Sequence, residues 1–423
     1  MQSGRHLGIL GLLLSILALL SSCSGAMNTT SPMASPTSTI LDLPIVTPAS
    51  TILPSESGTP TIAPVSVTAV LPAPLYVLAA GQIMRIERDG MTQTQITNEP
   101  APAPDLLAII EFDVAPTTDT LVYVVQSIDK PPILVRTDMN GNQRTVLLDD
   151  RSVLFPLLSP DGNTIAFSVF EHYANVGVQK PGLYFMPITG GEPRLILPNQ
   201  AVTDPNASEG DSRGFSPGAW SPDGTKLLVK AFSLTVERCE LAVVEVTSGA
   251  VTYFNIPTPD LVASCTAAAW SADSQTIYFN TAYPGSLINE PGIWQGDATS
   301  GNASALPLEP ANVWIRDPFA TSEQLYVFSA PFPDQATLDA EPYPSVGLTM
   351  HSVPLTGGRL SPLREDEHTL YLARWASDGS GAVIAERSES LQVRLLWLPA
   401  HGGATVELYR GQDVANIAWG KDS

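Results

Sequence analysis

The feature that most constrains the fold is a self-similarity with a period of about fifty residues, which runs from residue 74 to residue 423. Its first mark is a two-residue turn that follows an apolar run such as Ile83–Ile86 and in most copies precedes another, such as Arg194–Leu197. Two such runs around a small turn predict a β-hairpin, because glycine adopts positive φ at no steric cost. The seven turns are Asp89-Gly90, Asn140-Gly141, Gly190-Gly191, Ser248-Gly249, Ser300-Gly301, Gly357-Gly358 and Gly402-Gly403.

A second turn signature lies upstream of the later pairs. It is clearest in Trp220-Ser221-Pro222-Asp223-Gly224, which precedes the apolar run Lys226–Val229. Ser-Pro-Asp-Gly favours a type I turn, because serine caps the turn, proline presets φ and glycine relaxes the exit. Variants begin at Leu158, Trp270 and Trp375, and degenerate copies at Val114 and Phe319 keep the phase but lose the glycine. The repeating unit is therefore four strands, in the order A, turn, B, loop, C, turn, D.

These motifs resemble the TolB-like, or WD-like, β-propeller repeat, whose mark is Trp-Ser-Pro-Asp-Gly followed by an apolar strand. The resemblance covers roughly residues 74–423 and implies an all-β propeller of four-stranded antiparallel blades. TolB itself has six blades and a preceding α/β domain. This sequence matches neither feature, so the transport-associated role of TolB is not carried over.

The two ends of the repeat region predict how the ring closes. The region starts with a B-like strand, Leu75–Leu78, and ends with an A-like strand, Ile417–Trp419. A seven-bladed ring in which the C-terminal strand A joins the N-terminal strands B to D supplies both missing strands and removes the open edges. A solenoid or a pair of sandwiches is the alternative, and it leaves both ends unexplained.

The segment before the repeats predicts an address outside the cytoplasm. Residues 1–22 carry a short basic region and an uncharged apolar run that is too short to cross a bilayer, which is typical of a signal peptide. Leu20-Ser21-Ser22-Cys23 resembles the bacterial lipobox, which implies lipidation of Cys23 and a membrane anchor in the cell envelope. An ordinary secretory signal with a chance cysteine is the alternative. Residues 23–73 are rich in Ser, Thr and Pro and predict a disordered stalk before the 74–423 propeller.

The charge balance excludes one class of partner. The formal net charge is −21, so no basic surface is expected that would neutralise nucleic-acid phosphates. The same balance argues against attraction to acidic lipid headgroups. Contact with the membrane is therefore expected through the N-terminal lipid, and no nucleic-acid partner is expected.

Several motifs have a structural reading that outweighs the functional one. The tryptophans that recur at the end of strand A predict packing between blades rather than a sugar platform. The aspartates of the hairpins are turn residues first, although Asp138, Asn140 and Asn142 have the spacing of calcium ligands. Gly210–Gly214 matches the nucleophile elbow Gly-x-Ser-x-Gly but lies in a polar stretch with no helical domain. No catalytic residue, metal site or cofactor is predicted.

Two cysteines predict a disulfide. Cys239 precedes a C strand, and Cys265 lies where the chain enters the next A strand. In a four-stranded meander both connections emerge on the same face, so the thiols can meet, and an oxidising compartment favours their pairing. Two buried reduced thiols are the alternative.

The same face carries the longest connections, which is where propellers place recognition. A plain solvated surface is the competing interpretation. The candidate ligand-binding residues are His172, Tyr173, Asp211, Tyr283, Glu290, Arg316, Asp317 and Tyr343.

The sequence thus favours an extracytoplasmic, lipid-anchored lipoprotein whose propeller is a non-catalytic binding or scaffold module for a protein, peptide or glycan. The alternative is a propeller enzyme, a lyase or hydrolase acting on extracellular polysaccharide. That alternative requires a metal or a pair of carboxylates in the central funnel.

Overall fold

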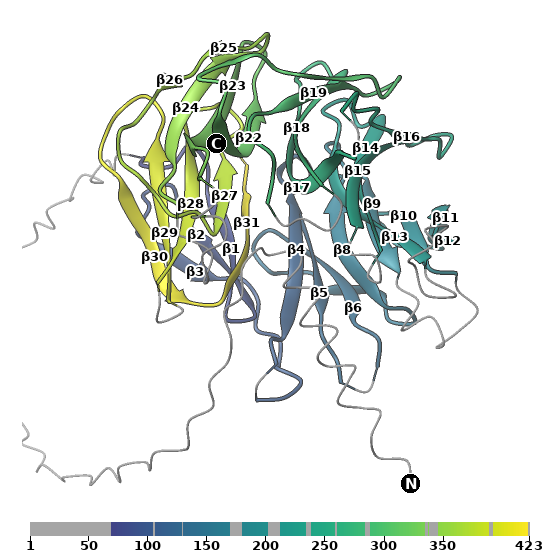
Figure 1. The fold of residues 1–423 in the computed structure, drawn as a ribbon. Helices are drawn as coiled ribbons and strands as arrows, with labels where there is room; N and C mark the ends of the chain where they lie inside the picture. The colour runs from purple at the N-terminus through teal and green to yellow at the C-terminus, as the bar shows by residue number, and fades with distance from the viewer. Residues whose placement is uncertain are drawn as a thin grey trace, which may run out of the picture.

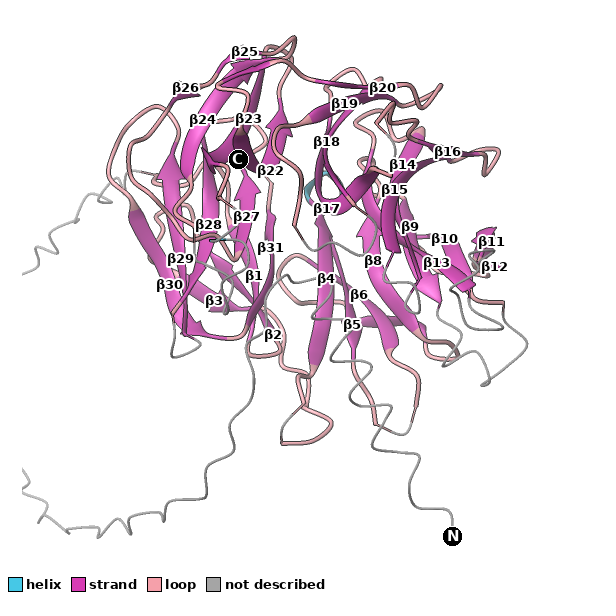
Figure 2. Ribbon diagram, viewed as in Figure 1, coloured by secondary structure: helices cyan, strands magenta, loops and turns pink. Residues whose placement is uncertain are grey.

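The computed structural model describes residues 69–421 apart from 105, 129, 170–179, 202–211, 234–237, 259, 284–287, 335–336, 338–345 and 389–391. The predicted signal peptide, Cys23 and most of the predicted stalk lie outside these residues. Strands dominate the described part of the chain (Figures 1 and 2), with a single turn of 3-10 helix named η1 at Pro116–Thr118.

The strands form four-stranded antiparallel units that follow one another along the chain. Units 1 to 3 are β31 (Val414–Trp419), β1 (Leu75–Ala79), β2 (Gln82–Ile86) and β3 (Gln93–Gln95); β4 (Ile109–Ala115), β5 (Thr120–Val125), β6 (Ile133–Asp138) and β7 (Thr145–Leu148); and β8 (Val153–Leu158), β9 (Thr164–Val169), β10 (Gly182–Pro187) and β11 (Arg194–Pro198).

The remaining units have the same order from first to last strand. Units 4 to 7 are β13 (Ser212–Trp220), β14 (Lys226–Ser233), β15 (Arg238–Glu245) and β16 (Val251–Tyr253); β17 (Val262–Trp270), β18 (Thr276–Ala282), β19 (Trp294–Asp297) and β20 (Ala303–Ala305); β22 (Val313–Ala320), β23 (Gln324–Pro331), β24 (Thr349–Pro354) and β26 (Ser361–Pro362); and β27 (Leu372–Trp375), β28 (Gly381–Arg387), β29 (Gln392–Pro399) and β30 (Val406–Gln412).

Short strands extend this pattern at two places. β12 (Gln200–Ala201) pairs with β13, and β21 (Leu308–Glu309) runs parallel to β25 (Gly358–Arg359). Units 4 and 5 also join into one sheet through a single pair, Glu240 opposite Ser264. Three-residue β16 pairs only with Ala242–Val244 of β15, which leaves the rest of that edge open to β17.

The core lies between consecutive units. Second strands such as β5 are buried along their whole length, whereas outer strands such as β3 are exposed. This gradient explains why the second strands read as continuous apolar runs, since both of their faces are covered. Each of the seven buried apolar clusters found among the described residues combines side chains of two consecutive units, and one of them joins unit 7 to unit 1.

The turns have the chemistry that the sequence predicts. In the Ser-Pro-Asp-Gly turn of unit 4, the Ser221 hydroxyl donates to Asp223 Oδ1 (2.6 Å) and accepts from the Lys226 backbone N–H (2.9 Å). Burial opposes the charge of Asp223, but the hydrogen bonds that Asp223 accepts from Ser221 and Thr225 outweigh burial and, with the nearby charge of Lys226, lower its pKa to about 2. Where the glycine is missing, Ser274 (φ 62°) and Asp119 (φ 52°) take the left-handed conformation in its place.

The recurring tryptophans pack between units, as predicted. Each indole is buried or half-buried and donates its Nε1–H to a backbone carbonyl in the first strand of the preceding unit. These bonds run from Trp220 to Leu157 (3.4 Å), Trp270 to Ala219 (3.0 Å), Trp375 to Asp317 (2.6 Å) and Trp419 to Trp375 (2.8 Å).

The strand nearest the C-terminus lies beside the first strand of the repeat region. β31 pairs antiparallel with β1 (Figure 1). Trp419 stands opposite Leu75, and the Gly420 N–H donates to the Pro74 carbonyl at 2.7 Å. Packing begins slightly before the predicted boundary at 74. The Val70 and Leu71 N–H groups both donate to the Arg88 carbonyl, and Leu71 is buried in the cluster between units 7 and 1.

Candidate functional site

The candidate site is built on the first strand of each unit. These strands are β31, β4, β8, β13, β17, β22 and β27, and six of them show a register shift against their partner strand. Such bulges re-aim side chains and are frequent beside functional sites. Two of them place a residue other than glycine in the left-handed region, Phe155 (φ 56°) and Asp317 (φ 47°).

Two carboxylates of β4 reach the neighbouring strand β8. Glu111 Oε2 accepts the Phe155 backbone N–H, and Asp113 Oδ2 accepts the Leu158 backbone N–H at 2.7 Å. The first strands of the units are called the inner strands below. Inner strands of consecutive units share no ladder of backbone hydrogen bonds, so the Phe155 and Leu158 N–H groups bond to a side chain instead. The two acids are two residues apart and therefore share one side of the strand.

The surroundings change the ionisation of both acids. Burial raises the pKa of Glu111 to about 8, and burial raises the pKa of Asp113 to about 6. At neutral pH Glu111 is therefore mostly protonated and can donate a hydrogen bond, whereas Asp113 is mostly ionised. Paired groups with such separated pKa values are typical of functional sites.

Two cations face these acids from units that are not adjacent to unit 2. Lys230 of β14 attracts Glu111, and Arg374 of β27 attracts Asp113. Unit 3 lies between β4 and β14, and β31 lies between β4 and β27, so each attraction passes over an intervening unit. Burial lowers the pKa of Lys230. Glu111, Asp113, Lys230 and Arg374 are called the inner-strand cluster below.

The predicted ligand-binding residues divide into two groups. Arg316 and Asp317 lie in the inner strand β22, with Arg316 Nη2 3.7 Å from Asp317 Oδ2, and burial raises the pKa of Asp317. Tyr283, which is 49 % exposed, and Glu290 flank the connection after β18, where the Glu290 N–H donates to the Thr281 carbonyl. The other four residues lie outside the described part of the chain: His172, Tyr173, Asp211 and Tyr343.

The inner-strand cluster is a set of residues that the sequence reasoning missed. A signal for it exists, because Glu111 and Asp113 interrupt an otherwise apolar run, Ile109–Ala115, at alternate positions. A charged pair on one side of a strand that is buried on both faces is unusual and marks a place where burial has to be compensated.

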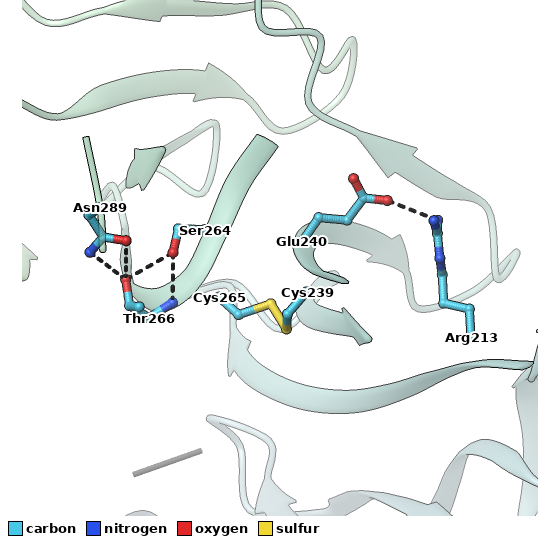
Figure 3. Close-up of a disulfide and its surroundings, with 7 residues drawn as sticks. All are labelled: Arg213, Cys239, Glu240, Ser264, Cys265, Thr266 and Asn289. Atoms are coloured by element: carbon cyan, nitrogen blue, oxygen red, sulfur yellow. Dashed lines mark hydrogen bonds and ion pairs between the residues drawn. A yellow bond between two sulfur atoms is a disulfide. The ribbon is translucent and has the colours of Figure 1, made fainter. Parts of the chain in front are cut away.

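The two cysteines are joined at the junction of units 4 and 5. Cys239 lies near the start of β15 and Cys265 lies in β17. A disulfide joins them, with their Cα atoms 5.7 Å apart. Figure 3 shows the disulfide between two polar contacts: the Arg213–Glu240 ion pair (2.8 Å) on one side and hydrogen bonds of Thr266 with Ser264 and Asn289 on the other. The disulfide therefore ties the start of β15 in unit 4 to β17 in unit 5.

A cleft of about 580 Å³ lies away from the inner strands, between units 5 and 6. Its lining is mostly apolar and includes Trp294, Leu308 and Gly357, with the exposed carboxylate Glu309 at its edge. Of the four predicted ligand-binding residues that the structure describes, none lines it.

Among the described residues, no group of three or more His, Cys, Asp or Glu side chains is placed to hold a metal ion. Within the same residues, no helix has the length and apolar character needed to span a bilayer.

Comparison with known proteins identifies the fold. No protein-family model matches the sequence, and no curated protein matches it. Among solved structures, the tricorn protease is similar over 82 % of this chain and 34 % of its own, with 9 % identity and a TM-score of 0.53. A puromycin-hydrolysing peptidase of Mycobacterium tuberculosis is similar over 78 % of this chain and 49 % of its own, with 16 % identity and a TM-score of 0.51.

TolB from Acinetobacter baumannii is a further neighbour, covering 80 % of this chain and 78 % of its own with 16 % identity and a TM-score of 0.43. The successive antiparallel four-stranded units, the inner strands and the shared fold define an all-β protein of the β-propeller class. At these identities the likeness concerns the fold alone, and the chain spans only about a third of the tricorn protease and half of the peptidase.

Proposed function

We propose that the seven units are seven blades of a closed propeller, spanning residues 74–423, in which β31 completes the blade of β1 to β3. A hydrogen bond joins the inner regions of every pair of consecutive units, which supports this closure. Besides the four tryptophan bonds, Asn280 donates to the Ile315 carbonyl, Asn416 donates to the Phe112 carbonyl and Asp113 accepts from Leu158. An open solenoid would leave units 7 and 1 unconnected.

The same proposal gives the ring one functional role: a non-catalytic binding module for a protein, peptide or glycan, with its ligand site at the inner-strand cluster. The observation that carries this proposal is the convergence of opposite charges from three separate units on one axial space. Glu111 offers a donor and Asp113 an acceptor at neutral pH, and Lys230 and Arg374 add two further donors. Such a lining suits a ligand with both hydroxyl or amine donors and carbonyl or carboxylate acceptors.

The predicted residues at Arg316 and Asp317 extend the site on β22, and Tyr283 and Glu290 belong to the connections above it. The module is held outside the cytoplasmic membrane by a lipid on Cys23, through the 23–73 stalk that follows the 1–22 signal peptide. The resemblance of Leu20–Cys23 to the lipobox supports this anchor.

Arrays of envelope glycans and peptides would test the binding role. We expect at least one class of probe to bind the wild type, and Asp113→Asn and Lys230→Met to weaken that binding at least tenfold. Glu323→Gln, which removes an exposed charge from a turn outside the inner strands, is the matched control. Equal binding by all variants, or binding of no probe, would refute the site.

The anchor has its own test. Metabolic labelling with an alkyne fatty acid is expected to label the wild type in a bacterial host and to leave Cys23→Ser unlabelled. Equal labelling of both proteins would contradict lipidation at Cys23.

One observation favours an enzyme as the second candidate. Glu111, protonated at neutral pH, and Asp113, ionised, have the states of a general acid and a base in polysaccharide cleavage. Release of reducing or unsaturated ends from envelope polysaccharides, abolished in Glu111→Gln, would establish this activity. No release from any of a panel of polysaccharides would remove it.

A further inference from the structure

The contact between the turn glycine and the preceding unit differs from junction to junction, and Gly190 of unit 3 meets only the Leu147 side chain, at 3.8 Å. At several junctions the turn glycine of one unit packs directly on the preceding unit: a Cβ on Gly141 would stand 2.2 Å from the Ile96 carbonyl oxygen, and a Cβ on Gly301 would stand 2.3 Å from that of Tyr253. The corresponding Gly402 of unit 7 has open space around it. At this junction, between units 6 and 7, a chain of charged side chains takes the place of the backbone contact.

The charges alternate along this chain. Arg364 forms a bidentate pair with Asp366, with Nε–Oδ1 at 2.7 Å and Nη2–Oδ2 at 2.9 Å. Asp366 Oδ2 lies 2.9 Å from His368 Nε2, and His368 Nδ1 lies 2.8 Å from Glu386 Oε1. Arg394 pairs with the other oxygen of Glu386. The five side chains, Arg364, Asp366, His368, Glu386 and Arg394, are called the junction cluster.

His368 connects the two units. Its backbone N–H and carbonyl exchange hydrogen bonds with Leu348, just before β24 of unit 6, both at 2.9 Å. Its ring contacts Glu386 in β28 of unit 7. Arg364 adds a second link across the same junction, because it donates to the Pro399 and Gly403 carbonyls at 3.2 and 3.1 Å.

The hydrogen-bond geometry of the His368 imidazole requires this side chain to be protonated and positively charged. Both ring nitrogens lie within hydrogen-bond distance of carboxylate oxygens, which accept only, so both nitrogens have to carry a proton. A neutral imidazole has one N–H, so one of the two contacts would set a nitrogen lone pair against a carboxylate. His368 is 9 % exposed, and water has little access to relieve that repulsion.

We propose that the junction cluster is a proton-operated lock: it holds units 6 and 7 together while His368 is charged and loosens this one junction when His368 loses its proton. The lock is a conformational device separate from the ligand site, and it acts through the His368 contacts that join unit 6 to unit 7.

The charged groups around the His368 imidazole determine the pH range in which the lock is closed. Burial opposes the charge of His368, but the hydrogen bonds to Glu386 and Asp366 outweigh burial and raise its pKa. The Arg364 bond lowers the pKa of Asp366, and the His368 bond lowers that of Glu386. Arg394 also attracts Glu407 of β30. The carboxylates therefore stay charged below their ordinary titration range, and the lock opens as the pH rises through the raised pKa of His368.

Hydrogen exchange measured by mass spectrometry on the purified full chain tests the lock. Labelling times are scaled at pH 6 and pH 9 to cancel the intrinsic pH dependence of exchange. We expect wild-type peptides covering 346–352, 364–372 and 382–396 to lose at least tenfold protection at pH 9, while peptides around Gly141 do not change. His368→Gln should show the weaker protection at both pH values. His401→Gln, which changes an exposed histidine, should behave as wild type.

Nuclear magnetic resonance titration of the His368 ring in the wild type keeps the test decisive if His368→Gln does not fold. The lock predicts a midpoint above the ordinary 6.5, coincident with the loss of protection. A midpoint at or below 6.5, or protection at the junction that does not depend on pH, would overturn the proposal.

Discussion

Replacing Glu111 with glutamine tests the electrostatics of the inner strands most directly. Glutamine keeps the shape of the side chain and an oxygen that accepts the Phe155 N–H, but it cannot ionise. The folded protein raises the pKa of Glu111 from an ordinary 4.5 to about 8 through burial. Between these two pH values the folded state keeps a proton that the unfolded state has released, so the stability of the wild type falls as the pH rises.

The size of the effect follows from the same two numbers. Each pH unit corresponds to 1.36 kcal/mol, so the pKa change sets an upper limit of about 5 kcal/mol. The Glu111 side chain is only partly shielded from water, and we expect about 2 to 4 kcal/mol to be realised. Glu111→Gln should therefore gain stability relative to wild type from pH 5 to pH 8, and the gain should level off above pH 8.

Urea unfolding followed by tryptophan fluorescence at pH 5 to 9 measures this difference. Other titrating groups are present in both proteins and cancel in the comparison. Glu323→Gln, at an exposed turn position, should track the wild type at every pH. A difference between wild type and Glu111→Gln that is constant from pH 5 to pH 9 would show that Glu111 ionises normally, and the argument for a buried, protonated acid would fail.

Two further substitutions test the packing. Gly301→Ala should lower the free energy of unfolding by about 2 to 4 kcal/mol or prevent folding, because the new Cβ would stand 2.3 Å from the Tyr253 carbonyl oxygen at φ 73°. Gly402→Ala, with φ 90° and open space, should lower it by about 1 kcal/mol. Equal shifts in the thermal unfolding temperature would contradict the close approach at Gly301. Replacing Cys239 and Cys265 with serine should lower stability by about 3 kcal/mol in urea under oxidising conditions, and a reductant should destabilise the wild type but not this variant.

The repeat could be predicted from the sequence because its determinants are local. Ser221 and Asp223 are two residues apart and bond to each other within the turn, so the motif specifies its own geometry without help from the rest of the chain. The tryptophans were predictable for a related reason, since a residue that recurs at the same position in four units is expected to make a contact that these units share. The disulfide was predicted from the strand order together with the expected oxidising compartment, because that order allows Cys239 and Cys265 to meet.

The inner-strand cluster could not be predicted in the same way. Asp113 reaches the Leu158 N–H across 45 residues, and Lys230 reaches Glu111 from a third unit, so neither contact leaves a local pattern. The long connections are visible in the sequence as a local pattern, and Tyr283 and Glu290 were predicted as ligand-binding residues from it. Connection length shows where a chain has freedom, whereas charge burial depends on which strands face one another after folding.

Departures from the repeat carry information that the repeat itself does not. Positions that recur in several units, such as the turn serine and the strand-end tryptophan, explain how those units form and pack. Unit 7 keeps its tryptophan, Trp375, but loses the close glycine contact at Gly402, and the junction cluster lies at this same junction. Each blade of a propeller contacts mainly its two neighbours, so a weak junction cannot be relieved elsewhere and has to be held locally. Ionic side chains hold it, and under the proposed lock the protonation of His368 decides how firmly they do so.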